Sequence, residues 1–111
     1  MKYEISHKTL IINNIKLDFL VDIKKVIEFQ DGLVLMLKMS PGYFIDNVFF
    51  INADGTIRWQ IEPFVKTENP KYTGYTNIWE KDGQLHVFLF DGFDCVIDPN
   101  TGKILSRFLT M

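Results

Sequence analysis

Most of this 111-residue chain reads as one strand–turn–strand unit written twice. Asp31-Gly32 and Asp82-Gly83 each separate two runs of strand-forming residues, and Ile51-Asn-Ala-Asp-Gly-Thr-Ile57 is matched by Ile97-Asp-Pro-Asn-Thr-Gly-Lys-Ile104. An Asp-Gly pair between apolar runs is the strongest short-range signal for a β-hairpin, because its turn residues must tolerate positive φ. No segment keeps a helical period as well as these segments keep strand character. The duplication therefore predicts two copies of an antiparallel meander.

The expected strands differ in how they would be covered. Leu33–Leu37, Val48–Ile51 and His86–Phe90 are apolar on both faces, which is typical of strands that are covered on both sides. Residues 57–61 alternate between apolar and polar, as in a half-exposed outer strand. The strands that we expect are Val26–Phe29, Leu33–Leu37, Asn47–Asn52, Ile57–Ile61, Asn77–Lys81, Gln84–Phe90, Phe93–Asp98 and Lys103–Thr110.

These strands predict a single all-β domain over residues 1–111, with two antiparallel four-stranded meander sheets over 23–62 and 77–110. Residues 1–22 carry two further strand-like runs, Thr9–Ile12 and Ile15–Phe19, which predict an extra N-terminal hairpin. This hairpin would either cover an open face of the first sheet or extend its edge.

A resemblance to a known family rests on two of these segments. Cys95-Val-Ile-Asp-Pro-Asn-Thr-Gly-Lys-Ile-Leu105 resembles the strand–turn–strand piece of quinoprotein-type β-propeller repeats, and residues 49–59 are a looser copy. Propeller blades are four-stranded units that repeat every ~40–50 residues. The resemblance implies two sheets stacked like adjacent blades, a half-propeller, and no cofactor, because the turn carries no quinone-binding side chains. The periodicity also fits a β-sandwich.

Composition excludes several classes of function. The net charge is −2, the pI is about 5.6, and the chain has no cluster of basic residues beyond Lys24-Lys25, so direct nucleic-acid binding is not expected. No apolar run has the length of a membrane span, and the first residues lack the apolar stretch of a signal peptide. The single cysteine, Cys95, allows no disulfide within the chain. We therefore expect a cytoplasmic protein that does not bind membranes.

Catalytic and metal-binding patterns are missing as well. Two histidines and one cysteine make no zinc set, and His86 and Cys95 lie in apolar strands, where a core role is expected. Asp54-Gly55 and Asp98–Gly102 lack the alternating acids of a calcium loop, so they are interpreted as turns. We predict no enzyme activity, no cofactor and no metal site.

The connections between strands direct attention to one end of the molecule. In an up-and-down sheet alternate connections lie at the same end, which groups the loop 40–46, the connector 62–76 and the turn 91–92. A connector of that length is usually functional or disordered. Aromatic and acidic residues gather there, and aromatic anchors with negative charge suit a basic protein partner. The predicted contact residues are Tyr43, Phe44, Asp46, Glu68, Tyr72, Tyr75, Asp91 and Asp94. The other interpretation is that the rings cap the core and the acids are solvated.

A second resemblance indicates a function, and it rests on size, charge and fold class. A small acidic all-β chain without catalytic groups resembles the immunity proteins that bacteria pair with secreted toxins, including those of contact-dependent growth inhibition systems. The resemblance implies a protein-binding inhibitor that covers the active site of a basic, nuclease-type toxin. The alternatives are a carbohydrate- or small-ligand-binding module, in which Trp59, Trp79 and the tyrosines stack on the ligand, and a half-propeller that forms a homodimer.

Overall fold

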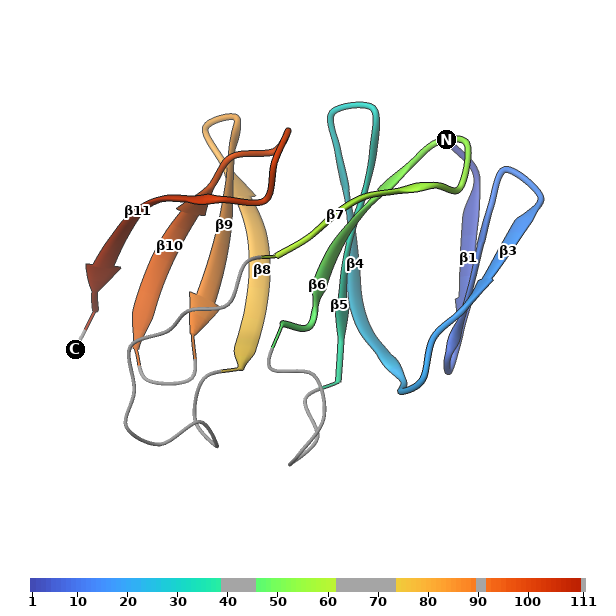
Figure 1. Cartoon of the computed structure of the whole chain (residues 1–111), viewed down its shortest axis with the longest axis horizontal. Helices are drawn as coiled ribbons and strands as arrows, with labels where there is room; N and C mark the ends of the chain where they lie inside the picture. The colour runs from blue at the N-terminus through green and yellow to red at the C-terminus, as the bar shows by residue number, and fades with distance from the viewer. Residues whose placement is uncertain (39–45, 62–73, 90–91, 111) are drawn as a thin grey trace.

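The computed structural model describes residues 1–38, 46–61, 74–89 and 92–110, and it shows three antiparallel sheets stacked one after another (Figure 1). The described residues form strands and turns and no helix, so none of them makes a helix that could span a membrane. The predicted all-β fold with two four-stranded meanders and an additional N-terminal unit is confirmed.

The three sheets follow one another along the chain. The N-terminal sheet contains β1 (Tyr3–Ser6), β2 (Thr9–Ile12) and β3 (Ile15–Asp18). The middle sheet contains β4 (Ile23–Phe29), β5 (Gly32–Leu37), β6 (Val48–Asn52) and β7 (Ile57–Gln60). The C-terminal sheet contains β8 (Tyr75–Lys81), β9 (Gln84–Leu89), β10 (Phe93–Ile97) and β11 (Ile104–Leu109).

The middle sheet is covered on both faces. One face packs on the C-terminal sheet through a core that includes Val34, Phe50 and Val87. The other face packs on the N-terminal sheet through a second core that includes Leu10 and Leu33. This confirms that the inner strands of the first meander are apolar because both of their sides are buried. It also decides between the two expectations for the N-terminal unit, which covers a face and does not extend an edge.

The N-terminal unit has one more strand than the sequence predicted. Strand β1 pairs with β2 from Tyr3 opposite Ile12 to Ser6 opposite Thr9. The turn between them is His7-Lys8, with His7 at a φ of 53°. Neither residue belongs to the usual turn formers, so the local sequence carries no hairpin signal at this point. Turn chemistry therefore does not predict this pairing, in which Tyr3 is the β1 residue that packs against the second core.

The glycines of Asp31-Gly32 and Asp82-Gly83 play different roles. Asp82 and Gly83 have φ values of 52° and 79°, as expected for the two central residues of a hairpin turn. Gly32, in contrast, is already paired with Phe29, and the turn residue with positive φ is Gln30. A Cβ at Gly32 would lie 2.5 Å from the carbonyl oxygen of Ile51. The first glycine thus permits close approach of a neighbouring strand, and the predicted turn is displaced by one residue.

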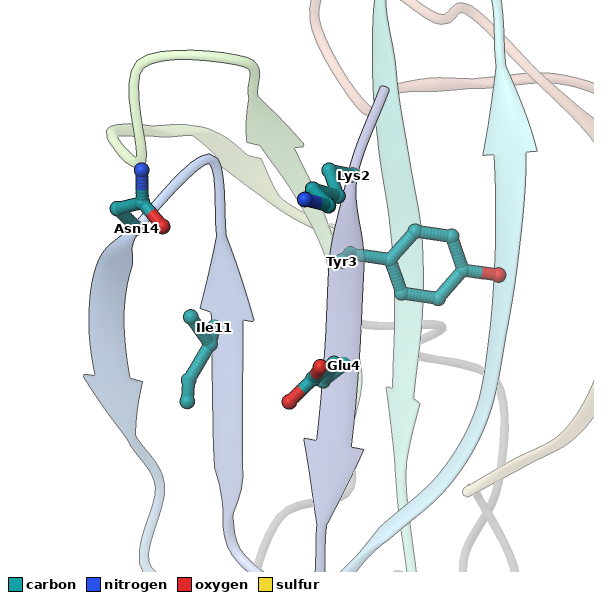
Figure 2. Close-up of a pocket in the computed structure, with 5 residues that line it drawn as sticks. All are labelled: Lys2, Tyr3, Glu4, Ile11 and Asn14. Carbon is teal, nitrogen blue, oxygen red and sulfur yellow. The ribbon is translucent and has the colours of Figure 1, made fainter.

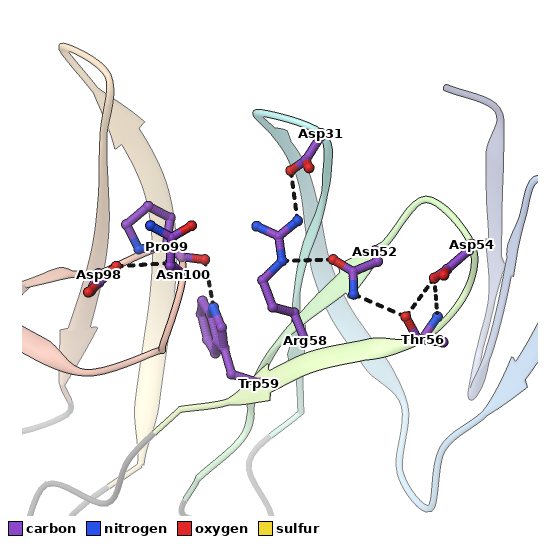
Figure 3. A network of polar contacts seen from close by, with 9 residues as sticks. All are labelled: Asp31, Asn52, Asp54, Thr56, Arg58, Trp59, Asp98, Pro99 and Asn100. Atoms are coloured by element: carbon purple, nitrogen blue, oxygen red, sulfur yellow. Dashed lines mark hydrogen bonds and ion pairs between the residues drawn. The ribbon is translucent and has the colours of Figure 1, made fainter.

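A polar network joins the tight turns (Figure 3). The Arg58 guanidinium donates to Asp31 at 2.9 Å and to Asn52 at 2.7 Å, and it lies 4.1 Å from the centre of the Phe50 ring. The indole of Trp59 donates to the carbonyl of Pro99 at 2.8 Å, which ties β7 to the last turn of the C-terminal sheet.

The duplicated turns use the same side-chain chemistry. Asp54 accepts a hydrogen bond from the amide of Thr56 at 3.0 Å, and Asp98 accepts one from the amide of Asn100 at 2.9 Å. The bonds from Thr56 lower the pKa of Asp54. In the part of the chain that the structure describes, no group of three acidic, histidine or cysteine side chains could hold a metal ion. Asp54-Gly55 and Asp98–Gly102 both form turns closed by backbone hydrogen bonds, as predicted.

Candidate functional site

The described strand ends on either side of residues 39–45 and 62–73 are joined by one side chain. The side chain of Asn47, which is fully buried, donates to the carbonyl oxygens of Leu37 at 2.8 Å and Tyr75 at 2.9 Å. Its own oxygen accepts the amide of Tyr75 at 3.1 Å. This one side chain therefore joins the end of β5, the start of β6 and the start of β8. The described residues that flank 39–45 and 62–73 lie together.

Five of the eight predicted contact residues fall outside the described part of the chain, and three fall within it. Those outside are Tyr43, Phe44, Glu68, Tyr72 and Asp91. Tyr75 is 1% exposed and packs in the core between the middle and C-terminal sheets. It offers no surface to a partner in this structure. Asp46 and Asp94 are both partly exposed.

The carboxylate of Asp46 is partly buried and, within the described ranges, lacks a hydrogen bond that would offset its loss of hydration. Its Oδ1 atom is buried and has no hydrogen-bond partner among the described residues. Gln60 donates to the backbone carbonyl of Asp46, at 2.9 Å, and not to its carboxylate. Burial therefore raises the pKa of the Asp46 carboxyl above its ordinary value of 3.8.

The raised pKa of Asp46 gives a stability prediction. The folded state holds the proton more tightly than the unfolded state, so ionisation destabilises the fold as pH rises from 3.8 through the higher folded-state pKa. Replacing Asp46 with asparagine is expected to raise the free energy of unfolding at pH 7 by up to about 1 kcal/mol, a figure discounted for the exposed part of the carboxylate. Chemical denaturation at pH 7 and pH 3 measures this, and the gain should vanish at pH 3.

Asp31 provides the control with the opposite sign. The hydrogen bond from Arg58 lowers the pKa of the Asp31 carboxyl, so its stabilising effect is present at neutral pH and lost in acid. Asp31→Asn should therefore lower stability at pH 7. A gain for Asp31→Asn, or a loss for Asp46→Asn, would contradict this description of the two carboxylates.

Asp94 lies on a sheet face that carries several aromatic rings. In β9 and β10, Val87 and Cys95 point into the core, so the alternate residues point outward. We call the surface formed by these outward residues and their cross-strand neighbours the outer C-terminal face. It includes Trp79, His86, Phe88, Asp94 and Phe108. No described element covers this face.

A stacked and hydrogen-bonded pair forms the centre of the outer C-terminal face. The His86 ring lies parallel to the Trp79 ring, with 5.4 Å between centroids and 14° between planes. Its Nδ1 atom lies 3.0 Å from Oδ1 of Asp94. An ionised carboxylate only accepts hydrogen bonds, so Nδ1 carries the proton that joins the two side chains. His86 is 9% exposed, which confirms the predicted buried, hydrogen-bonded histidine.

The outer face of the N-terminal sheet is different in kind. It carries a pocket of about 270 Å³ lined by Lys2, Tyr3, Glu4, Ile11 and Asn14 (Figure 2). The Tyr3 ring points away from Ile11, toward the strands of the middle sheet, where it packs on the second core. The side chains that remain on the outer face are short of aromatic surface and carry both signs of charge. This face therefore differs in chemistry from the outer C-terminal face.

Sequence reasoning placed Asp94 in the contact but missed its neighbours. His86–Phe90 was interpreted as covered on both sides, whereas Phe88 is only partly buried and faces outward. The available signal was the alternation of Gln84, His86 and Phe88 with Leu85, Val87 and Leu89. Trp59 is 6% exposed and bonded through its indole, so it provides no stacking platform for a ligand.

Comparison with known proteins gives one match. The family model of a domain of unknown function, DUF7957, matches residues 1–109. No curated protein and no solved structure matches the chain.

Proposed function

We propose a function for this chain, which belongs to the DUF7957 family, on the basis of the surface that its three stacked sheets leave open. The protein is a protein-binding inhibitor, an immunity-type protein that neutralises a basic, nuclease-type toxin by covering its active site. It works in the cytoplasm and needs neither a cofactor nor catalytic groups of its own.

One observation carries the proposal: the outer C-terminal face joins large rings to a carboxylate. Phe108 is 58% exposed, Trp79 and Phe88 are partly exposed, and Asp94 lies among them. Aromatic side chains supply most of the energy of protein interfaces, and complementary charge supplies specificity and rapid association. A net charge of −2 on the whole chain favours a basic partner.

Asp46 gives the proposal independent support. A partly buried carboxylate without a hydrogen-bond partner lowers stability, so a folding role does not account for it. Functional sites often contain residues that lower the stability of the fold. Asp46 lies at the end of the sheets where Asp94 also lies, because Asn47 joins that end of β6 to the start of β8.

The carbohydrate-binding alternative has less support. It relied on Trp59, Trp79 and the tyrosines, of which Trp59 and Tyr75 are buried in the core. Trp79 remains, but one face of its ring is occupied by His86. A homodimer through the outer C-terminal face is the remaining alternative, and the mass of the isolated chain in solution distinguishes it from a monomer that binds a different protein.

Co-expression tests the proposal. The chain is produced together with basic ribonuclease-type toxin domains encoded beside genes of this family, and growth of the host is measured. We expect one such toxin to be neutralised. The double variant Asp94→Asn/Phe108→Ala should lose affinity for that toxin at least about 30-fold, as expected for removing a hot spot worth about 2 kcal/mol. Binding should also weaken as salt concentration rises.

A matched pair on the other outer face provides the control. Glu4 faces Ile11 across β1 and β2 just as Asp94 faces Phe108 across β10 and β11. Glu4→Gln/Ile11→Ala should therefore leave neutralisation intact. If no toxin is neutralised, the proposed function is wrong. If the control variant loses activity and Asp94→Asn/Phe108→Ala does not, the surface is wrong.

A further inference from the structure

We infer that the outer C-terminal face contains a binding site for a cationic side chain, an arginine guanidinium, with Asp94 as its counter-ion and the surrounding rings as its walls. The inference rests on the proposed function in taking the source of the guanidinium to be a basic protein.

The pairing of the strands places the carboxylate between two rings. Asp94 lies directly opposite Phe88 on β9 and directly opposite Phe108 on β11. Directly opposed residues of an antiparallel pair have Cβ atoms roughly 4.5–5.5 Å apart and share one face of the sheet. Asp94 is therefore flanked by a phenyl ring on each side. The centroid of the Trp79 ring lies 6.4 Å from the centroid of the Phe88 ring.

The carboxylate is held in place before any ligand binds. His86 engages Oδ1 of Asp94 at 3.0 Å, and the stacked Trp79 ring fixes the plane of the imidazole. The side chain of Asp94 is nevertheless 23% exposed, against 11% for His86. The carboxylate can therefore receive a further donor from solvent or from a partner. Orientation before binding lowers the conformational entropy that the Asp94 side chain loses when a partner binds.

Among the described residues, no lysine or arginine forms an ion pair with Asp94. Lys81 is opposite Gln84, near the tight turn at the far end of β8 and β9. Arg107 is opposite Cys95, so its register places it on the inner side of the sheet. Within the described strands, Asp94 is thus a carboxyl group among rings, with Nδ1 of His86 as its hydrogen-bond partner.

Guanidinium is the cation that fits this combination. It is planar, stacks on aromatic faces, is less strongly hydrated than an ammonium group and pairs well with carboxylates. A cation over a ring adds to the attraction when water is excluded. The chain already shows the same association at Arg58, whose guanidinium lies over Phe50 and pairs with Asp31.

An NMR titration of the intact chain tests the inference. The probes are a short acetylated peptide with two arginines and the same peptide with citrulline, which keeps the shape of arginine but removes its charge. We expect saturable shifts of the Trp79 indole and of the Asp94 and Phe108 amides with the arginine peptide. Binding of the citrulline peptide should be at least tenfold weaker.

Two variants decide the assignment. Asp94→Asn should weaken binding of the arginine peptide at least tenfold. Phe108→Ala, at an exposed position, should also weaken binding of this peptide without affecting the fold. Asp18→Asn, an exposed acid of the N-terminal sheet, should have no effect. Equal binding of both peptides, shifts centred on the N-terminal sheet, or full affinity in Asp94→Asn would overturn the inference.

The inference and the proposed function fail separately. If the chain neutralises a toxin and Asp94→Asn retains full affinity for it, the inference falls and the function stands. If the arginine peptide binds at Asp94 but no basic toxin is neutralised, the site stands and the function falls.

Discussion

Replacing Asn47 with leucine is expected to lower the free energy of unfolding by about 3 kcal/mol, because three hydrogen bonds are lost at a site without solvent. The side chain of Asn47 is 0% exposed and bonds to the backbone of Leu37 and Tyr75. Leucine has the same branched shape and is larger than asparagine, so the loss reports the buried polar groups left without their partner, together with some overpacking, and not a cavity. Denaturation in urea measures the change, and the melting temperature should fall by about 10 °C.

Asn100→Ala is the control for Asn47→Leu. Asn100 is exposed and uses its backbone amide, not its side chain, to bond with Asp98. This change should stay within about 0.5 kcal/mol of the wild type. If Asn47→Leu is equally mild, the buried side chain does not hold the two meanders together at this end.

Gly102→Ala should be the second most damaging change, with a loss of roughly 2–4 kcal/mol from backbone strain and overpacking together. Gly102 has a φ of 77°, a region that residues with a Cβ rarely adopt. An added Cβ would also lie 2.7 Å from the Trp59 ring, whose indole is fixed by Pro99. The ring has no room to move, since Trp59 is part of the core. Thermal or chemical denaturation measures the loss.

Gly83→Ala separates the two causes. Gly83 has a φ of 79°, and an added Cβ would meet no atom within 4 Å. This variant reports backbone strain alone, which amounts to about 1–2 kcal/mol. The excess loss in Gly102→Ala is then the cost of crowding Trp59. Equal losses in the two variants would show that the contact between the last turn and β7 is not tight.

The fold could be predicted where the signal was local. Asp82-Gly83 forms the expected hairpin because its turn chemistry is complete within two residues. The turn predicted at Asp31-Gly32 is displaced by one residue, because Gly32 is constrained by Phe50 and Ile51 on a different strand. Strand β1 was missed because its turn with β2 has no usual turn-forming residue.

The site was less predictable for the same reason. Asp94 could be singled out from its charge and its place near a turn. Its association with Phe88 and Phe108 depends on the register of three strands, which no single segment encodes. Tyr75 was assigned to the contact from its place beside the long connector, but its pairing with Leu89 directs it into the core.

The central claim is that the outer C-terminal face, and not the opposite end of the stack, meets the partner. Hydrogen–deuterium exchange of the chain, alone and bound to a toxin domain that it neutralises, measures this directly. We predict slower exchange in β9, β10 and β11 on binding, with no change in β1, β2 and β3. Protection confined to the N-terminal sheet would contradict the claim.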